Sequence, residues 1–278
     1  MLTLISIELY KIFKKWRTYI GFITVAVLVI LIQVSMLIQG KQYLDFLTRN
    51  LQSTFVFVGN FLNGYLISYI VLTSLTVHIP FLITLVAGDI LAGEATAGTY
   101  RMLITRPISR VKLLTAKFIA AIIYTNLLIL FLAVVSLGLG IILFGTGELL
   151  IIRDTIIIFA QDDIFWRFIV AYGFAALAMT TVTSLAFLFS SLVENAIGPI
   201  VSTMAVIIVF LIIGSLEVEF FENLQPYLFT TYISAWRDIF DDPVDYDLLG
   251  KSLFVLLGHT ITFFGITLAL FRKKDITS

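Results

Sequence analysis

Long uncharged apolar runs alternate with short polar segments along this chain. Six such runs cover residues 18–40, 50–88, 118–147, 168–193, 195–216 and 252–271. Each reaches the roughly 20 residues that a helix needs to cross a hydrocarbon core about 30 Å thick. Leu, Ile, Phe and Val predominate without strict alternation, which excludes a membrane β-barrel and indicates helices. The pattern predicts an all-α integral membrane protein with six transmembrane helices.

The residues before the first run predict a helix of another kind. Apolar side chains recur at helical spacing from Leu2 to Trp16, while Glu8, Lys11 and Lys14 occupy the opposite face. Such an amphipathic helix lies in the membrane interface. Within one transmembrane domain over 1–278, we expect this interfacial helix at 1–17 and membrane helices at 18–38, 65–88, 112–144, 166–190, 195–214 and 251–271.

The second apolar run, residues 50–88, is too long for one span, and it has two interpretations. Either residues 60–64 turn between two short crossings, or an outer segment leads into one span that begins near Tyr65. Two crossings would place the later basic segment outside, against the rule that Lys and Arg stay on the cytosolic side. We therefore predict one span, with a kink at Pro80 just after His78.

Several helix boundaries can be predicted from capping residues. Ser109 is a candidate N-cap for the third span, which continues to about Phe144. Ser191 and Glu194 have the spacing of a capping box and predict the start of the fifth span. Asp242 and Pro243 read as N-cap and first helical residue of the sixth.

The segment before the sixth span, residues 215–250, is acidic and rich in aromatic residues, among them Trp236. Aromatic side chains interleaved with charge favour short helices half-buried in the outer interface, in a re-entrant arrangement. Trp236, with His78 and Pro80 in the second span, is a candidate lining residue of a transport pathway.

Composition and charge agree with a membrane protein and orient it. Apolar residues make up 60% of the 278 residues and charged residues only 13%, and the formal net charge is zero. With both termini in the cytosol, the inner segments hold 12 Lys and Arg and 5 acids, while the outer segments hold 6 and 13. This bias predicts a multi-pass protein of the cell inner membrane with both termini cytosolic.

The polar segment between the second and third spans is the strongest candidate for function. Residues 88–110 are longer than a topological loop requires, and three glycines permit close approach of another backbone. Glu94 lies among cations, which charge sorting alone does not explain. The segment reads either as a coupling helix held by a cytosolic motor or as a basic loop that sets topology.

The motif that begins Gly-Asp-Ile-Leu-Ala-Gly-Glu at Gly88 and ends Thr-Arg-Pro-Ile-Ser-Arg at Arg110 resembles the signature of ABC-2 type permease subunits. The segments 227–236 and 271–276 are similar to the same family. These proteins are the membrane subunits of type V ABC exporters. The resemblance implies an N-terminal connecting helix, six membrane helices, a coupling helix over 89–110, and re-entrant helices before the sixth span. Candidate contacts with the ATPase are Glu94, Gly98, Thr99, Arg101 and Arg106.

The expected motor is a separate polypeptide. The chain has no P-loop, because Glu follows Gly88-x-x-x-x-Gly93 where Lys would hold a phosphate. ATP and Mg would bind to a cytosolic ABC ATPase subunit present in two copies, beside a second permease subunit in a homodimer. We expect no catalytic residue, no metal site, no cofactor in this chain, and no nucleic-acid partner; membrane lipid surrounds the spans. The chain has no cysteine.

Two other functions stay open at this stage. One is a secondary carrier or channel, although the span centres lack the carboxylates that ion-coupled carriers usually need. The other is a membrane anchor whose loop recruits a cytosolic partner without transport. An ATPase that co-purifies with the chain would argue against the first, and ATP-dependent flux would argue against the second.

Overall fold

The computed structural model describes residues 1–49, 59–98, 109–153, 155–216 and 218–273. Five helices in these ranges are long and apolar enough to cross a membrane, and a bent pair of shorter helices raises this number to as many as six. The long helices are α2 (Trp16–Thr48), α7 (Arg110–Phe144), α8 (Gln161–Leu192), α9 (Gly198–Ser215) and α11 (Tyr246–Lys273), and the bent pair is α3 (Gly64–Leu75) and α4 (Ile79–Ala87). The chain is thus a largely helical membrane protein.

The second expected span is broken in the middle. Helices α3 and α4 meet at 56° across a gap of a few residues. Pro80 lies in the first turn of α4, where its missing N–H costs no hydrogen bond, and its ring prevents a continuous helix through the preceding turn. The predicted kink is confirmed. Asn63 caps α3, since its side-chain oxygen accepts from the amides of Tyr65 and Leu66.

Of the three predicted helix starts, one is confirmed and two are wrong. Ser109 caps α7 and accepts from the amide of Lys112 at 3.3 Å. Ser191 instead lies inside α8, and Asn195 accepts from the amides that open α9. Helix α11 begins at Tyr246, where Asp245 accepts from the amides of residues 247 and 248, so Asp242 is not its cap. In both cases an Asn or Asp side chain nearer to the first helical residue accepts these hydrogen bonds in an Asx turn and takes the capping role.

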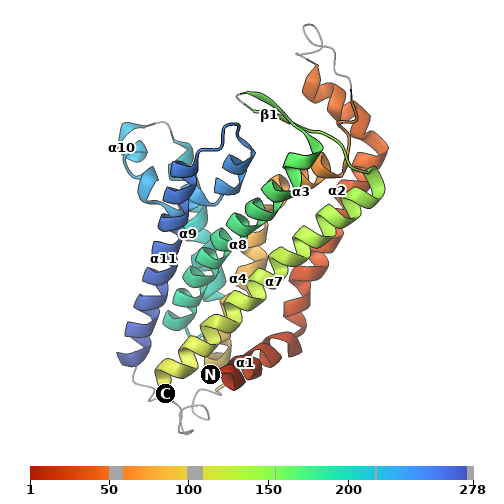
Figure 1. Cartoon of the computed structure of the whole chain (residues 1–278). Coiled ribbons are helices and arrows are strands. Elements are labelled where there is room, and N and C mark those ends of the chain that lie inside the picture. The colour runs from red at the N-terminus through yellow and green to blue at the C-terminus, as the bar shows by residue number, and fades with distance from the viewer. Residues whose placement is uncertain (50–58, 99–108, 154, 217, 274–278) are drawn as a thin grey trace.

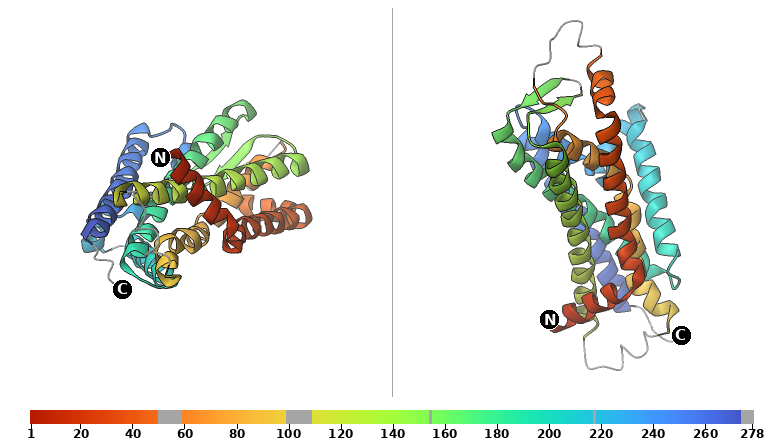
Figure 2. Two further views of the ribbon diagram at one scale, coloured as in Figure 1. Left: turned by 90° about the horizontal axis from the view of Figure 1, so that it is seen from below. Right: turned by 90° about the vertical axis from the view of Figure 1, so that its right-hand side faces the viewer.

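Helix α8 is the centre of the bundle, and it packs against α4, α7, α9 and α11 (Figures 1 and 2). Helices α3 and α7 approach closely at a pair of glycines. A Cβ atom on Gly64 would lie 2.5 Å from the backbone of Gly140, so position 64 requires glycine, and a Cβ atom on Gly140 would lie 3.0 Å from the carbonyl oxygen of Gly64. Ser68 of α3 donates to the carbonyl of Ser136 in α7 at 3.1 Å near this contact.

A small cap covers one end of the bundle, which we call the hairpin end. Strands β1 (Leu149–Ile152) and β2 (Ile156–Phe159) pair antiparallel there, in the segment between the predicted spans 112–144 and 166–190. The short helices α10 (Glu219–Glu222), η1 (Gln225–Tyr227), η2 (Phe229–Tyr232) and η3 (Ala235–Phe240) lie at the same end (Figure 1). Short helices therefore precede the last long helix, and their outer, re-entrant placement stays a prediction.

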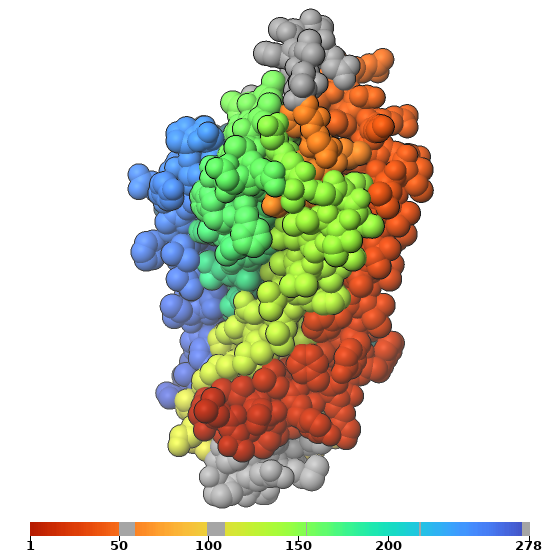
Figure 3. Space-filling model, turned by 45° about the vertical axis from the view of Figure 1, so that its right-hand side comes forward, coloured from red at the N-terminus to blue at the C-terminus, as the bar shows by residue number. Residues whose placement is uncertain are grey.

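The opposite end, which we call the α1 end, holds α1 (Leu2–Lys14), the C-terminal end of α11, and the short polar helix α5 (Asp89–Thr96). Helix α1 packs against α7, and the N-terminal residues, coloured red, extend across the lower end of the molecule in Figure 3. Its buried positions are Glu8 and Ile12. An amphipathic helix that buries an acid toward the bundle needs a cationic partner there.

Candidate functional site at the α1 end

Helix α5 forms most of the described part of the predicted coupling segment, and both of its ends are hydrogen-bonded to the bundle. Gly88, between α4 and α5, has helical dihedral angles, so α5 follows α4 directly. The Ser190 hydroxyl of α8 accepts from the amides of Leu91 and Ala92 and donates to the carbonyl of Gly88. Thr96 donates to the carbonyl of Glu194 at 2.8 Å. Otherwise unsatisfied donors at the start of α5 are thus paired with α8.

Four charged side chains, Glu8, Lys11, Glu94 and Lys117, form what we call the central cluster. The Nζ atom of Lys117 lies 2.7 Å from Glu8 Oε2 and 2.6 Å from Glu94 Oε1. The Nζ atom of Lys11 lies 2.7 Å from Glu8 Oε1 and 3.1 Å from Glu94 Oε1. Only 1% of the Lys117 side chain is exposed. The cluster joins α1, α5 and α7 through alternating charges.

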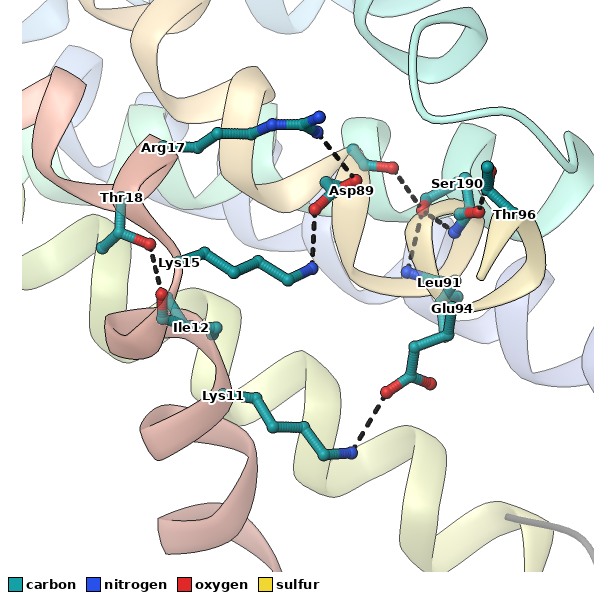
Figure 4. Close-up of polar contacts among 12 residues, drawn as sticks. Lys11, Ile12, Lys15, Arg17, Thr18, Asp89, Leu91, Glu94, Thr96 and Ser190 are labelled. Carbon is teal, nitrogen blue, oxygen red and sulfur yellow. Dashed lines mark hydrogen bonds and ion pairs between the residues drawn. The ribbon is translucent and has the colours of Figure 1, made fainter. Parts of the chain in front are cut away.

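A second group of ion pairs ties α5 to the junction of α1 and α2. Asp89 accepts from Lys15 Nζ at 2.7 Å and from Arg17 Nη1 at 3.3 Å. The hydroxyl of Thr18 donates to the carbonyl of Ile12 and closes the bend between the two helices. Figure 4 shows Lys11, Lys15 and Arg17 extending from α1 and α2 toward the carboxylates of α5. Both acids of α5 are therefore held by the N-terminal segment.

Electrostatics inside the central cluster favour the charged forms of Glu8 and Lys11. Burial raises the pKa of the Glu8 carboxyl, but the nearby ammonium groups of Lys117 and Lys11 outweigh burial and hold that pKa below its ordinary 4.5. Burial likewise acts to lower the pKa of Lys11, and contacts with Glu8 and Glu94 outweigh it, so the pKa lies above 10.5. Opposite charges thus stabilise Glu8 and Lys11 at positions where their side chains are partly buried.

A cavity of about 450 Å³ lies beside these ion pairs. Its walls come from α1, the first turn of α2, α4 and α5. Apolar side chains such as Ile12, Val86 and Ile90 line it together with the charged groups. Within the described ranges, no group of three or more His, Asp or Glu side chains has the arrangement of a metal site.

The structure brings some of the predicted site residues together and leaves others apart. Glu94 lies in the central cluster with its side chain 13% exposed, facing the bundle. Gly98 is exposed, with a φ of 65° that favours glycine. Thr99, Arg101 and Arg106 lie outside the described residues. Their role as ATPase contacts, and that of Glu94 and Gly98, stays a prediction.

The three candidate pathway residues occupy different places. His78 is exposed at the break between α3 and α4, where its Nδ1 lies 2.8 Å from the carbonyl of Ser74. Pro80 is buried. Trp236 is fully buried at the hairpin end and packs edge-on against Tyr69 of α3. Their role in a pathway stays a prediction.

Two members of the central cluster were missed from the sequence. Lys117 lies near the start of the third predicted span, and its side chain is almost completely buried between two carboxylates. Glu8 was assigned to the charged face of α1 without a partner. The sequence did contain a signal, because Glu8 and Glu94 are each an acid inside an otherwise basic segment. A buried acid needs a cationic partner, so each of these acids implies a cation from another part of the chain.

The fold and the site together define a membrane protein in which a cluster of buried ion pairs lies at one end of a helical bundle. The chain belongs to the family described as "Protein of unknown function (DUF2705)", which matches residues 18–277. It is also 26% identical over 206 residues to "Uncharacterized protein YhcI" of Bacillus subtilis (strain 168). That match covers 70% of this chain and 63% of the relative, so this chain spans less than two thirds of the relative's length.

Proposed function

We propose that this chain is the membrane-spanning subunit of an ATP-driven exporter, moved by a separate cytosolic ABC ATPase that docks on residues 89–110. The observation that carries the proposal is the attachment of α5. This helix follows α4 directly, bonds to α8 through Ser190, and is ion-paired to α1 and α7. A loop that only sets topology needs none of these contacts, whereas a coupling element needs all of them.

The proposed mechanism follows from this attachment. Two ATPase copies that close on ATP and Mg would displace α5, and the displacement would pass to α4 without loss because no flexible linker separates them. The break between α3 and α4 can absorb the resulting rotation, as a hinge at the end of a helix does. Nucleotide would supply the free energy that favours one state of the bundle over the other.

The remaining parts of the proposal rest on the resemblance to ABC-2 permease subunits and on charge sorting. The resemblance favours export and a homodimer of this chain with two ATPase subunits. The Lys and Arg bias favours the cell inner membrane with both termini in the cytosol. In that orientation the α1 end faces the ATPase.

Site-specific cross-linking tests the docking, because the chain has no cysteine of its own. Ala97→Cys places a thiol at the exposed end of α5, and Ala160→Cys places one at the hairpin end as a matched control. In membranes of the native host, we expect a bifunctional thiol-to-amine reagent to join Ala97→Cys to a protein with a P-loop. An ATPase adduct at the control position, or at neither position, contradicts the proposal.

A charge reversal in the central cluster tests the coupling. Glu94→Arg puts a third cation against Lys11 and Lys117, so we expect α5 to separate from α1 and α7 while membrane insertion remains. ATP-dependent flux in proteoliposomes that contain the ATPase should then be lost, and Glu94→Gln should lose less. Full flux in Glu94→Arg contradicts the mechanism. Flux without ATP would favour a carrier or channel, and a bound ATPase without any flux would favour a membrane anchor.

A further inference from the structure

The cavity at the α1 end carries an excess of positive charge. Four cations line it, Lys11, Lys14, Lys15 and Arg17, and Lys117 pairs with two of its acids from behind. Against these five cations stand three carboxylates, those of Glu8, Asp89 and Glu94. All three are already ion-paired inside the protein. The cavity therefore offers unneutralised cations and suits an anion.

The cations at the mouth retain donors for such an anion. Lys14 is exposed and forms no ion pair within the described part of the chain. Arg17 meets Asp89 through Nη1 at 3.3 Å, and a guanidinium group carries further N–H donors in a fixed plane. Lys15, also exposed, follows Lys14 in the sequence and lines the same cavity. A phosphodiester presents oxygens that suit donors of this kind.

The inner wall of the cavity has the opposite character, since Ile12, Val86 and Ile90 are apolar. Two exposed aromatic residues at the start of α2, Trp16 (74% exposed) and Tyr19 (48% exposed), adjoin the lining residues Arg17 and Thr18 in the sequence. Exposed Trp and Tyr rings at the end of a membrane helix mark the depth of lipid headgroups. A ligand that enters from this depth would bring a charged group to the lysines and an acyl chain to the apolar wall.

We propose that this cavity binds an anionic membrane phospholipid, with its phosphate held by Lys14, Lys15 and Arg17 and the first part of an acyl chain against Ile12, Val86 and Ile90. The volume of about 450 Å³ admits a headgroup with part of its chain. The lipid lies between α1 and the α4–α5 pair and adds to the contacts that hold α1 in place. This proposal stands without the proposed ATPase, because every residue that it uses belongs to this chain.

Native mass spectrometry of the purified full-length chain in neutral detergent tests the site. We expect dioctanoyl phosphatidylglycerol to bind and dioctanoyl phosphatidylcholine to bind far more weakly. Lys14→Gln/Arg17→Gln should weaken phosphatidylglycerol binding by about 30-fold, given the usual contribution of two cations near an anionic lipid surface. The matched control Lys41→Gln/Lys251→Gln removes two exposed cations elsewhere and should leave binding unchanged.

A second variant, Ala97→Trp, keeps every charge and places a large ring at the edge of the cavity. It should also weaken phosphatidylglycerol binding, and its unfolding temperature shows whether the fold is kept. Three results would overturn the proposal: equal binding of the two lipids, an equal loss in the control variant, or unchanged binding in Ala97→Trp. Complete displacement of the lipid by millimolar inorganic phosphate would instead assign the cavity to free phosphate, and that outcome also overturns it.

Discussion

Replacing Lys117 by Met tests whether the central cluster holds α1 and α5 to the bundle. Met has nearly the length and volume of Lys but no charge, so the substitution removes two ion pairs while filling the same space. The Glu8 and Glu94 side chains, only 7% and 13% exposed, would then share Lys11 as their cation within the cluster. Two buried carboxylates would then face one cation of the cluster instead of two.

The size of the effect follows from this geometry. Removing one partner of a buried ion pair typically costs about 3–5 kcal/mol, because the other charge stays buried. Lys11 still compensates one of the two acids, so we expect the lower end of this range, about 3 kcal/mol. At roughly 2–4 °C per kcal/mol for a larger domain, the unfolding midpoint should fall by about 6–12 °C.

Thermal unfolding of the purified chain in detergent, followed by tryptophan fluorescence, measures the shift. The matched variant is Glu8→Gln/Glu94→Gln/Lys117→Met, which removes the two acids together with the cation and leaves no buried carboxylate in the cluster. We expect it to recover most of the lost stability, since Lys11, the one charge that remains in the cluster, is 38% exposed and reaches water. A shift of 1 °C corresponds to about a third of one kcal/mol. A Lys117→Met variant whose unfolding midpoint lies within 1 °C of that of the parent chain would therefore refute the reasoning.

Two further predictions concern packing and pH. Gly64→Ala should destabilise the chain by about 1–3 kcal/mol, because its Cβ would meet the backbone of Gly140. The control Gly138→Ala has open space at the Cβ and should be neutral or stabilising. The unfolding midpoints of the two variants check this. The difference in midpoint between the parent chain and Glu8→Gln should be constant near neutral pH. It should shrink as pH falls below 4.5 through the lowered pKa of Glu8, and as pH rises above 10.5 through the raised pKa of Lys11; a difference that grows at acidic pH contradicts this sign.

Local features of the sequence predict much of this fold. The apolar runs locate the long helices, and Ser109 and Pro80 mark the start of α7 and the break before α4. These features act over a few residues, so one stretch of chain contains all the information. Asn195 and Asp245 show the limit, because several polar residues compete for each cap and the backbone path decides which one is used.

The β-hairpin and the central cluster were missed for another reason. The strands β1 and β2 are short apolar stretches that the sequence does not distinguish from the ends of spans. In the cluster, Glu8 and Lys117 are 109 positions apart, and Lys11 and Glu94 are 83 apart. Periodicity shows that a charge exists on a helix face, but only the packing of α1 across α7 determines which opposite charge it meets.

The distribution of strong contacts bears on how the bundle could move. Helix α5 is held by ion pairs and by Ser190, whereas the chain between α3 and α4 is interrupted and bent. If a force acts on α5, the break at residues 76–78 should therefore yield before the ion pairs do. Helix α3, fixed to α7 at Gly64 and Gly140, would stay in place while α4 rotates with α5. The charges at the α1 end and the glycines at the α3–α7 contact thus divide the second span into a moving half and a fixed half under the proposed function.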